Sequence, residues 1–250
     1  MAAITLEVIA CSVDDCHAVQ EGGGDRIELC SALELGGLTP SLGLLIAARR
    51  AVRLPIMAML RPRPGGFCYG EAEFAVMLAD AELALRHGAD GLVFGCLRAD
   101  GTVDEARTAA VVRLAGDRQT VFHRAFDVTP DPFAALDVLL RLGVTRVLSS
   151  GQQPSALAGA ANLAACRAHV GDRLQILPGA GITPANVREV LRRTGCDQVH
   201  ASLSGRTEDR STAGNEAIHF TPPALGSQDQ VRVTDRELVA AMRRELGWLP

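Results

Sequence analysis

Six ionisable side chains interrupt apolar runs of this sequence, at positions that would lie inside a folded protein. They are two carboxylates, two histidines and two arginines: Glu7, Glu28, Arg61, His123, Arg124 and His200. Ionisable groups in a protein interior are unfavourable unless they are paired or used. The set therefore indicates a catalytic or binding site, with a structural ion-pair network as the alternative. Two carboxylates beside histidine and arginine can abstract a proton next to a carbonyl or open a sugar ring.

The elements that must position these side chains follow a repeating order of short apolar run and longer helical pattern. Strands are expected over residues 5–11, 26–30, 56–61, 91–95, 120–124, 146–150, 174–178 and 198–202. Eight strands alternating with helices predict a single (β/α)8 TIM-like barrel over residues 1–250. The turn after the first strand is not the glycine-rich turn of an open dinucleotide-binding sheet, so no nucleotide cofactor is expected.

Helix starts and stops are marked in the sequence. Ser12 with Asp15 resembles a capping box, and Asp131-Pro132 and Thr183-Pro184 each place a cap residue before proline. Gly88, Gly143 and Gly195 are expected to end helices.

The second, fourth, sixth and eighth strands begin from similar segments, which start at residues 23, 88, 143 and 195. Their alignment predicts that Ile27, Leu92, Val147 and Val199 share one direction, and that Glu28, Val93, Leu148 and His200 share the other. We expect the second set to face the barrel axis. In the fifth strand, either His123 or Arg124 faces inward, depending on the register.

Several residues could bind an anion at the C-terminal end of the barrel. Arg61 and Arg63 present guanidinium groups, and barrels often bind phosphate at the loops after strands seven and eight. The candidates in glycine- and serine-rich loops are Ser150, Gly151, Gly179, Gly181, Ser202 and Gly205. Ordinary turns are the alternative interpretation.

Residues 205–231 form a long polar segment after strand eight, before a last helix that is expected near Thr234. A loop of this length is usually functional or disordered. A lid, a contact in a homo-oligomer and disorder are equally compatible with its composition.

Composition excludes several classes of function. A formal net charge of −4 and 4% aromatic residues argue against nucleic acid as a partner, and the apolar stretches are too short to span a membrane. No secretory signal is expected at the N-terminus, and seven scattered cysteines predict reduced thiols and a cytoplasmic location. The sequence contains no lysine, which excludes Schiff-base chemistry.

Blocks of sequence recur in the order that is typical of the CutC copper homeostasis family. The chain resembles that family at residues 7–8, 23–30, 34–41, 61–63, 90–95, 122–127, 150–151 and 178–182. The resemblance implies a TIM-like barrel, a cytosolic location and a role in copper handling. Two positions depart from the pattern: Ile9 stands where the family has a cysteine, and the Arg63 segment is one residue out of register.

Copper(I) prefers two or three soft sulfur ligands held close together. Cys30 matches the family position, and Cys11 ends the neighbouring strand, so the two could approach. Met57 and Met59 share one face of the third strand and could add sulfur. Packing in the core is the alternative role for all four residues.

Three functions therefore remain open. The first is copper homeostasis, with Cys30 and Cys11 as ligands of copper(I). The second is an enzyme that acts on a small phosphorylated or carboxylated metabolite by acid/base chemistry, with Glu28 and His123 as acid/base groups and Arg61 and Arg124 binding the anion. The third is a non-catalytic barrel that binds a ligand.

Overall fold

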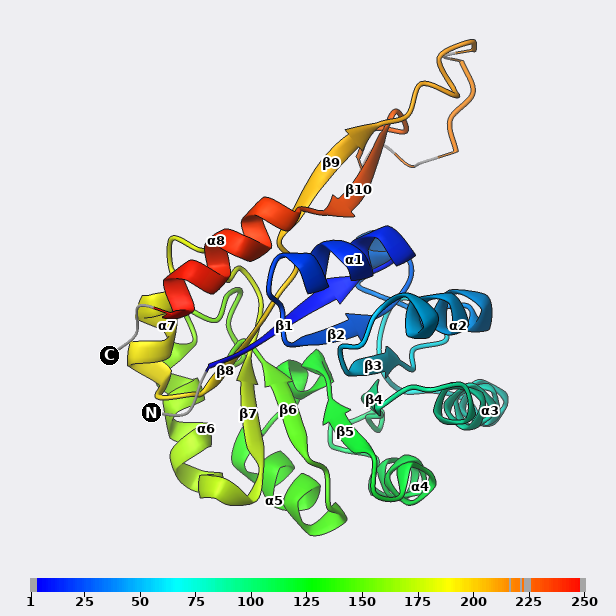
Figure 1. Ribbon diagram of the computed structural model, residues 1–250. Coiled ribbons are helices and arrows are strands. Elements are labelled where there is room, and N and C mark those ends of the chain that lie inside the picture. The colour runs from blue at the N-terminus through cyan, green and yellow to red at the C-terminus, as the bar shows by residue number, and fades with distance from the viewer. Residues whose placement is uncertain (1–3, 216, 221, 223–225, 248–250) are drawn as a thin grey trace.

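A computed structural model describes residues 4–215, 217–220, 222 and 226–247. Eight strands alternate with helices around a common axis, as expected of a (β/α)8 barrel (Figure 1). The strands are β1 (Thr5–Ala10), β2 (Arg26–Leu29), β3 (Ile56–Met59), β4 (Gly91–Phe94), β5 (Gln119–Phe122), β6 (Arg146–Ser149), β7 (Gln175–Pro178) and β8 (Gln198–Ala201). All eight strands overlap the predicted ones, which confirms the fold class.

The strands pair in parallel in the order β7-β6-β5-β4-β3-β2-β1-β8. The two end strands of this ladder, β7 and β8, are neighbours, so the barrel is nearly closed. Gln198 on β8 donates from Nε2 to Oε1 of Gln175 on β7 at 3.4 Å, which links the two strands by their side chains.

The outer layer contains α1 (Val13–Glu21), α2 (Leu42–Ala51), α3 (Glu71–Arg86), α4 (Glu105–Ala115), α5 (Pro132–Leu142), α6 (Ala160–Val170), α7 (Val187–Thr194) and α8 (Arg236–Gly247). The described residues also include three short 3₁₀ helices: η1 (Leu33–Leu35), η2 (Arg124–Val128) and η3 (Gly171–Arg173). None of the described helices is long and apolar enough to cross a membrane.

Most of the predicted helix signals are confirmed. Ser12 accepts a hydrogen bond from the Asp15 N–H, and Asp131 caps α5 with proline in its first turn. Gly143 and Gly195 end helices in the left-handed conformation. The predicted helix start at Thr183-Pro184 is wrong. The Thr183 carbonyl accepts a hydrogen bond from the Asn186 N–H in a tight turn, and α7 begins only at Val187.

Apolar side chains form two cores. The larger one lies between strands and helices and contains Ile27, Leu92, Val147 and Val199, while Val93 and Leu148 belong to a smaller cluster inside the barrel. The predicted register of the even strands is therefore confirmed. Strands β3 to β7 supply this inner apolar cluster through Met57, Met59, Val93, Val121, Leu148 and Leu177.

A polar layer closes the N-terminal end of the barrel, and we call it the floor. It consists of the residues that begin strands β2, β5, β6, β7 and β8, together with Glu7: Arg26, Gln119, Arg146, Gln175 and Gln198. Arg26 binds Glu7 and donates to Gln198 Oε1 at 3.0 Å. Arg146 donates to Gln175 Oε1 and to Gln119 Oε1, each at 2.9 Å. Of the six ionisable residues that the sequence indicated, only Glu7 takes part in the floor, through its ion pair with Arg26.

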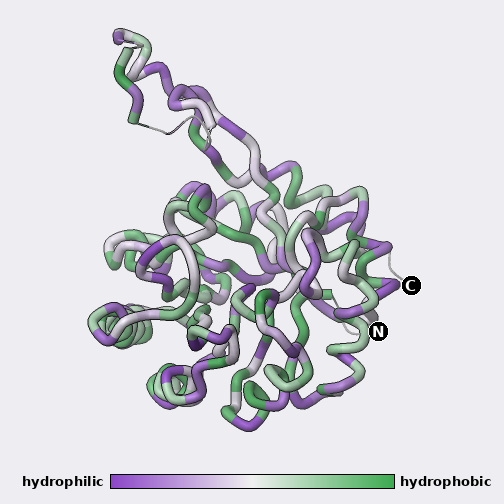
Figure 2. The backbone as a smooth tube through the Cα atoms, turned by 180° about the vertical axis from the view of Figure 1, so that it is seen from behind, coloured by the Kyte–Doolittle hydropathy of each residue, from purple (hydrophilic) through white to green (hydrophobic). Residues whose placement is uncertain are grey.

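The segment after β8 is not simply a loop, since it begins and ends as an antiparallel hairpin of β9 (Ser204–Glu208) and β10 (Gln230–Thr234). Figures 1 and 2 show this hairpin extending away from the barrel. Thr234 fixes its base, with its N–H donating to Asp15 Oδ1 at 2.6 Å and its hydroxyl to the Ile9 carbonyl at 3.1 Å. Residues 216, 221 and 223–225 of the expected loop lie outside the described residues.

Candidate functional site

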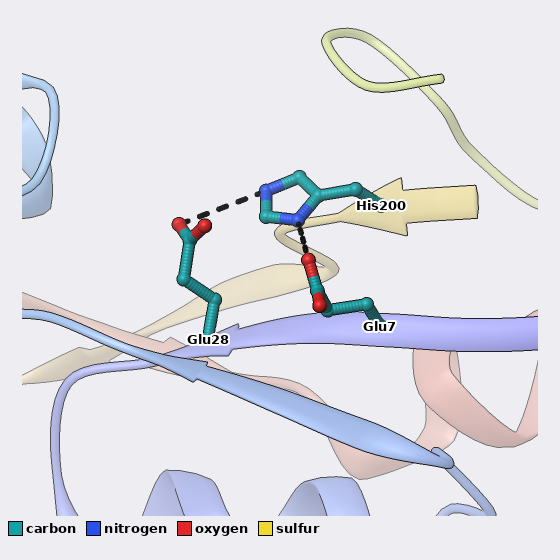
Figure 3. Close-up of side chains that lie close together, drawn as sticks. All are labelled: Glu7, Glu28 and His200. Atoms are coloured by element: carbon teal, nitrogen blue, oxygen red, sulfur yellow. Dashed lines mark hydrogen bonds and ion pairs between the residues drawn. The ribbon is translucent and has the colours of Figure 1, made fainter. Parts of the chain in front are cut away.

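Three of the predicted site residues meet inside the barrel on adjacent strands. Glu7 comes from β1, Glu28 from β2 and His200 from β8, and His200 lies between the two carboxylates (Figure 3). His200 Nδ1 is 2.8 Å from Glu7 Oε1, and its Nε2 is 3.9 Å from Glu28 Oε1. The first contact is a hydrogen bond, whereas the second is too long to be one.

The charges of this cluster are set by burial and by the floor. Burial alone would raise the pKa of Glu7, but the Arg26 guanidinium and the His200 ring hold that pKa well below its usual range. Burial raises the pKa of Glu28 to about 7. Burial lowers the pKa of His200, yet the Glu28 and Glu7 carboxylates outweigh it and raise that pKa overall. Glu7 and Glu28 therefore favour the protonated form of His200, whose second nitrogen faces Glu28.

After strand β5, His123 rather than Arg124 faces the interior of the barrel. His123 is 4% exposed, and its Nδ1 accepts the Ala125 N–H at 3.1 Å, while its Nε2 has no partner among the described residues. Burial, together with the charge of Arg61, lowers the pKa of His123 to about 3, so the ring is neutral. Arg124 instead begins η2, half exposed, and pairs with Asp127 at 2.8 Å.

Arg61 is buried beside His123, and the ring of Phe67 contacts both side chains. Arg61 Cζ lies 5.3 Å from the Phe67 centroid, and the His123 ring centre lies 5.0 Å from it. The guanidinium donates to the carbonyls of Leu35, Gly37 and Gly65, which ties the loops after β2 and β3 together. Its Nε has no partner among the described residues.

These groups line a cavity of about 670 Å³ at the C-terminal end of the strands, which we call the mouth cavity. Its polar wall contains Glu28, Arg61, His123 and His200, with Arg124 and Asp127 also lining it. Its apolar wall contains Ile9, Leu33, Met59, Phe67, Leu148, Ile182 and Leu203. Glu7 does not line the cavity itself, but it binds His200, which does.

The predicted anion-binding residues are only partly brought together. Gly181 and Ser202 line the mouth cavity, and a side chain at Gly179 would meet Leu148 and His200. Ser150 and Gly151 lie behind Asp127, whose carboxylate accepts the Ser150 N–H at 3.1 Å.

Two further anion candidates lie away from the mouth cavity. Gly205 belongs to the hairpin and faces Asp235. Arg63 points away to Glu73 and stacks on Tyr69, so the R-P-R spacing places only Arg61 at the cavity.

Two of the seven free cysteines form a pair at the edge of the same region. Cys11 Sγ and Cys30 Sγ lie 3.5 Å apart. This contact lowers the pKa of Cys11, whereas the contact and burial raise the pKa of Cys30. Met59 belongs to the same inner apolar cluster as Cys30, and Cys11 packs against that cluster. The predicted approach of the two cysteines is thus present in the structure.

Three residues that shape the site were not singled out from the sequence. Arg26 holds Glu7, Phe67 packs on Arg61 and His123, and Gly95 makes room for the His123 ring, since a Cβ there would lie 2.5 Å from it. Arg26 begins the same run that contains Glu28, so the alternation of side chains along β2 could have identified it. Phe67 and Gly95 follow strands in irregular segments, where no periodicity marks them.

Fold and site together define a class: a nearly closed (β/α)8 barrel with a polar cavity where its strands end. Comparison with known proteins identifies the particular family. The sequence profile of the CutC family matches residues 4–205, so the chain belongs to this family.

Relatives support the assignment over most of the chain. A CutC family protein of Treponema denticola is 46% identical over 230 residues, covering 92% of this chain and 94% of the relative. The human "Copper homeostasis protein cutC homolog" is 39% identical over 230 residues, covering 92% and 84%. The crystal structure of CutC from Streptococcus agalactiae is 30% identical, with a TM-score of 0.76, and covers 80% of this chain and 98% of that one.

Proposed function

We propose that this protein takes part in copper homeostasis by binding copper(I) through Cys11 and Cys30. The observation that carries the proposal is the 3.5 Å separation of the two sulfur atoms. The name of the human relative supports the same role.

The donor set suits copper(I). Thiolate and thioether sulfur are soft ligands that favour this ion, and Cys11, Cys30 and Met59 supply both kinds. The lowered pKa of Cys11, caused mainly by its contact with Cys30, favours its thiolate, which is the form that binds a metal. Ile9 does not prevent the pairing, because Cys11 reaches Cys30 from two residues further along the chain.

An entry path for the ion is present beside the pair. Cys11 is partly exposed and lines a second cavity, of about 850 Å³, at the base of the hairpin. Arg206 and Arg232 of the hairpin line the same cavity. All seven cysteines are free, and on that basis we place the protein in a reducing compartment, the cytoplasm.

An anaerobic titration of the reduced protein with copper(I), against a chromophoric copper(I) chelator, tests the proposal. We expect stoichiometric binding by the unmodified protein and its loss in Cys11→Ser and in Cys30→Ser. Cys68→Ser is the matched control, because Cys68 is exposed and lies outside the pair. Binding that survives in both variants of the pair would refute the assignment of the ligands.

A further inference from the structure

We infer that the mouth cavity is a binding site for a small organic acid that also carries hydroxyl groups, separate from the cysteine pair. Three of the residues that line it, on three different strand ends, each carry a buried polar atom without a hydrogen-bond partner among the described residues. The atoms are Glu28 Oε2, Arg61 Nε and His123 Nε2. Their residues are 3%, 7% and 4% exposed, so water access is limited.

Two of the three atoms are donors. His123 Nδ1 accepts the Ala125 N–H, so the neutral ring carries its hydrogen on Nε2. Arg61 Nε–H is also a donor, and its guanidinium is held in place by three backbone carbonyls. Both side chains contact Phe67, so the two residues that carry the donors are neighbours in the lining of the cavity. A carboxylate of the ligand would accept from both.

The third atom is an acceptor, on Glu28 next to His200 in the lining of the same cavity. Glu28 Oε2 has no donor, and Glu28 Oε1 is 3.9 Å from His200 Nε2, which leaves both groups available to one ligand. A hydroxyl group can donate to the carboxylate and accept from the imidazole at the same time. The apolar wall would cover the carbon atoms of the ligand.

The contrast with the floor distinguishes this interpretation from a structural one. In the floor, Glu7, the two arginines Arg26 and Arg146, and the three glutamines bind each other, and of their buried polar atoms only Arg146 Nη1 lacks a partner among the described residues. In the mouth cavity, three side chains each retain an unpaired atom. An unmade hydrogen bond of a buried group is unfavourable, so such atoms in one cavity indicate a ligand. The volume of about 670 Å³ lies within the usual range for small-molecule sites.

Isothermal titration calorimetry of the copper-free, reduced protein with three probes of similar length tests the inference. Gluconate carries a carboxylate and hydroxyls, hexanoate carries only the carboxylate, and sorbitol carries only hydroxyls. We expect gluconate to bind at least about 10-fold more tightly than either of the others, because each lacks hydrogen bonds to a charged or buried group. No binding of gluconate, or equal binding of all three probes, would overturn the inference.

Two variants test which residue binds the hydroxyl groups of the ligand and which binds its carboxylate. Glu28→Gln should weaken gluconate and sorbitol binding about 10-fold and leave hexanoate unchanged, with Glu82→Gln on the exposed face of α3 as its matched control. His123→Phe should weaken gluconate and hexanoate, with His169→Phe on α6 as control. Cys11→Ser should leave gluconate binding unchanged, because Cys11 lines the other cavity, and this separates the site from the copper proposal. Gluconate affinity that is unaffected in Glu28→Gln and in His123→Phe would also overturn the inference.

Discussion

Replacing Gly95 with alanine tests whether the His123 ring is held rigidly at the cavity wall. The added Cβ would lie 2.5 Å from both Nδ1 and Cε1 of His123, and 2.7 Å from the Cβ of Ala125. Gly95 does not have a positive φ, so alanine fits its backbone and the whole effect is steric.

The magnitude follows from what His123 would lose. Phe67 and Phe122 flank the ring, with centroid separations of 5.0 and 6.3 Å, so the ring cannot move aside freely. Overpacking a buried site costs about 1–3 kcal/mol, and loss of the Ala125 N–H bond adds about 1 kcal/mol. We expect Gly95→Ala to lower the free energy of unfolding by about 2–4 kcal/mol.

Equilibrium urea denaturation measures the change. Gly66→Ala is the control, because a Cβ there meets no atom within 4 Å, and its effect should lie within about 0.5 kcal/mol of zero. A double variant, Gly95→Ala with His123→Ala, should lose less stability than the two single variants added together, since the clash with the His123 ring is then removed. If Gly95→Ala is as stable as Gly66→Ala, the reasoning about a rigid His123 is wrong.

Three further predictions concern the charges around the site. Arg26→Met leaves Glu7 as a buried charge without its guanidinium partner and should cost about 3–5 kcal/mol in urea denaturation; a loss below 1 kcal/mol would contradict the pairing. The pKa of His123 is lowered from 6.5 to about 3, so the unfolded chain binds more protons between these values and the contribution of His123 to stability falls as pH decreases through this window. Melting temperatures of His123→Phe and the unmodified protein from pH 7 to 4 should therefore converge, or cross in favour of the variant, and parallel curves would count against a neutral buried ring. Asp127→Asn should cost about 1–3 kcal/mol by calorimetric melting, because the carboxylate binds Arg124 and the Ser150 N–H; an unchanged melting temperature would show these contacts to be dispensable.

Much of the fold is predictable from the sequence, because a buried parallel strand is a short apolar run and eight of them recur between helical patterns. Alternation along each strand also predicts the inward direction of Glu28 and His200, which the inner and outer cores confirm. The register of strand five was not predictable, since His123 and Arg124 are adjacent and both are polar. The turn to η2 directly after the strand decides in favour of His123.

Contacts between loops were the part that the sequence could not supply. Arg61 and Arg63 are equivalent by type, yet one binds three carbonyls under the cavity and the other pairs with Glu73 outside. Their difference depends on where the loops after β2 and β3 meet. The hairpin was missed for a related reason: β9 and β10 are separated by a long polar segment, so their pairing leaves no local signal.

Glu7 is shared between the floor and the mouth cavity, and this has a consequence for redesign of the barrel. One of its oxygens binds Arg26 in the floor, and the other binds His200 at the cavity. A library of variants confined to the loops around the mouth would leave the Arg26–Glu7–His200 chain intact and could explore new ligands on an unchanged frame. A library that altered Arg26 would instead remove the ion-pair partner of Glu7, the residue that binds His200, without touching the cavity wall. A substitution in the floor can therefore change the surroundings of His200 at the other end of the barrel.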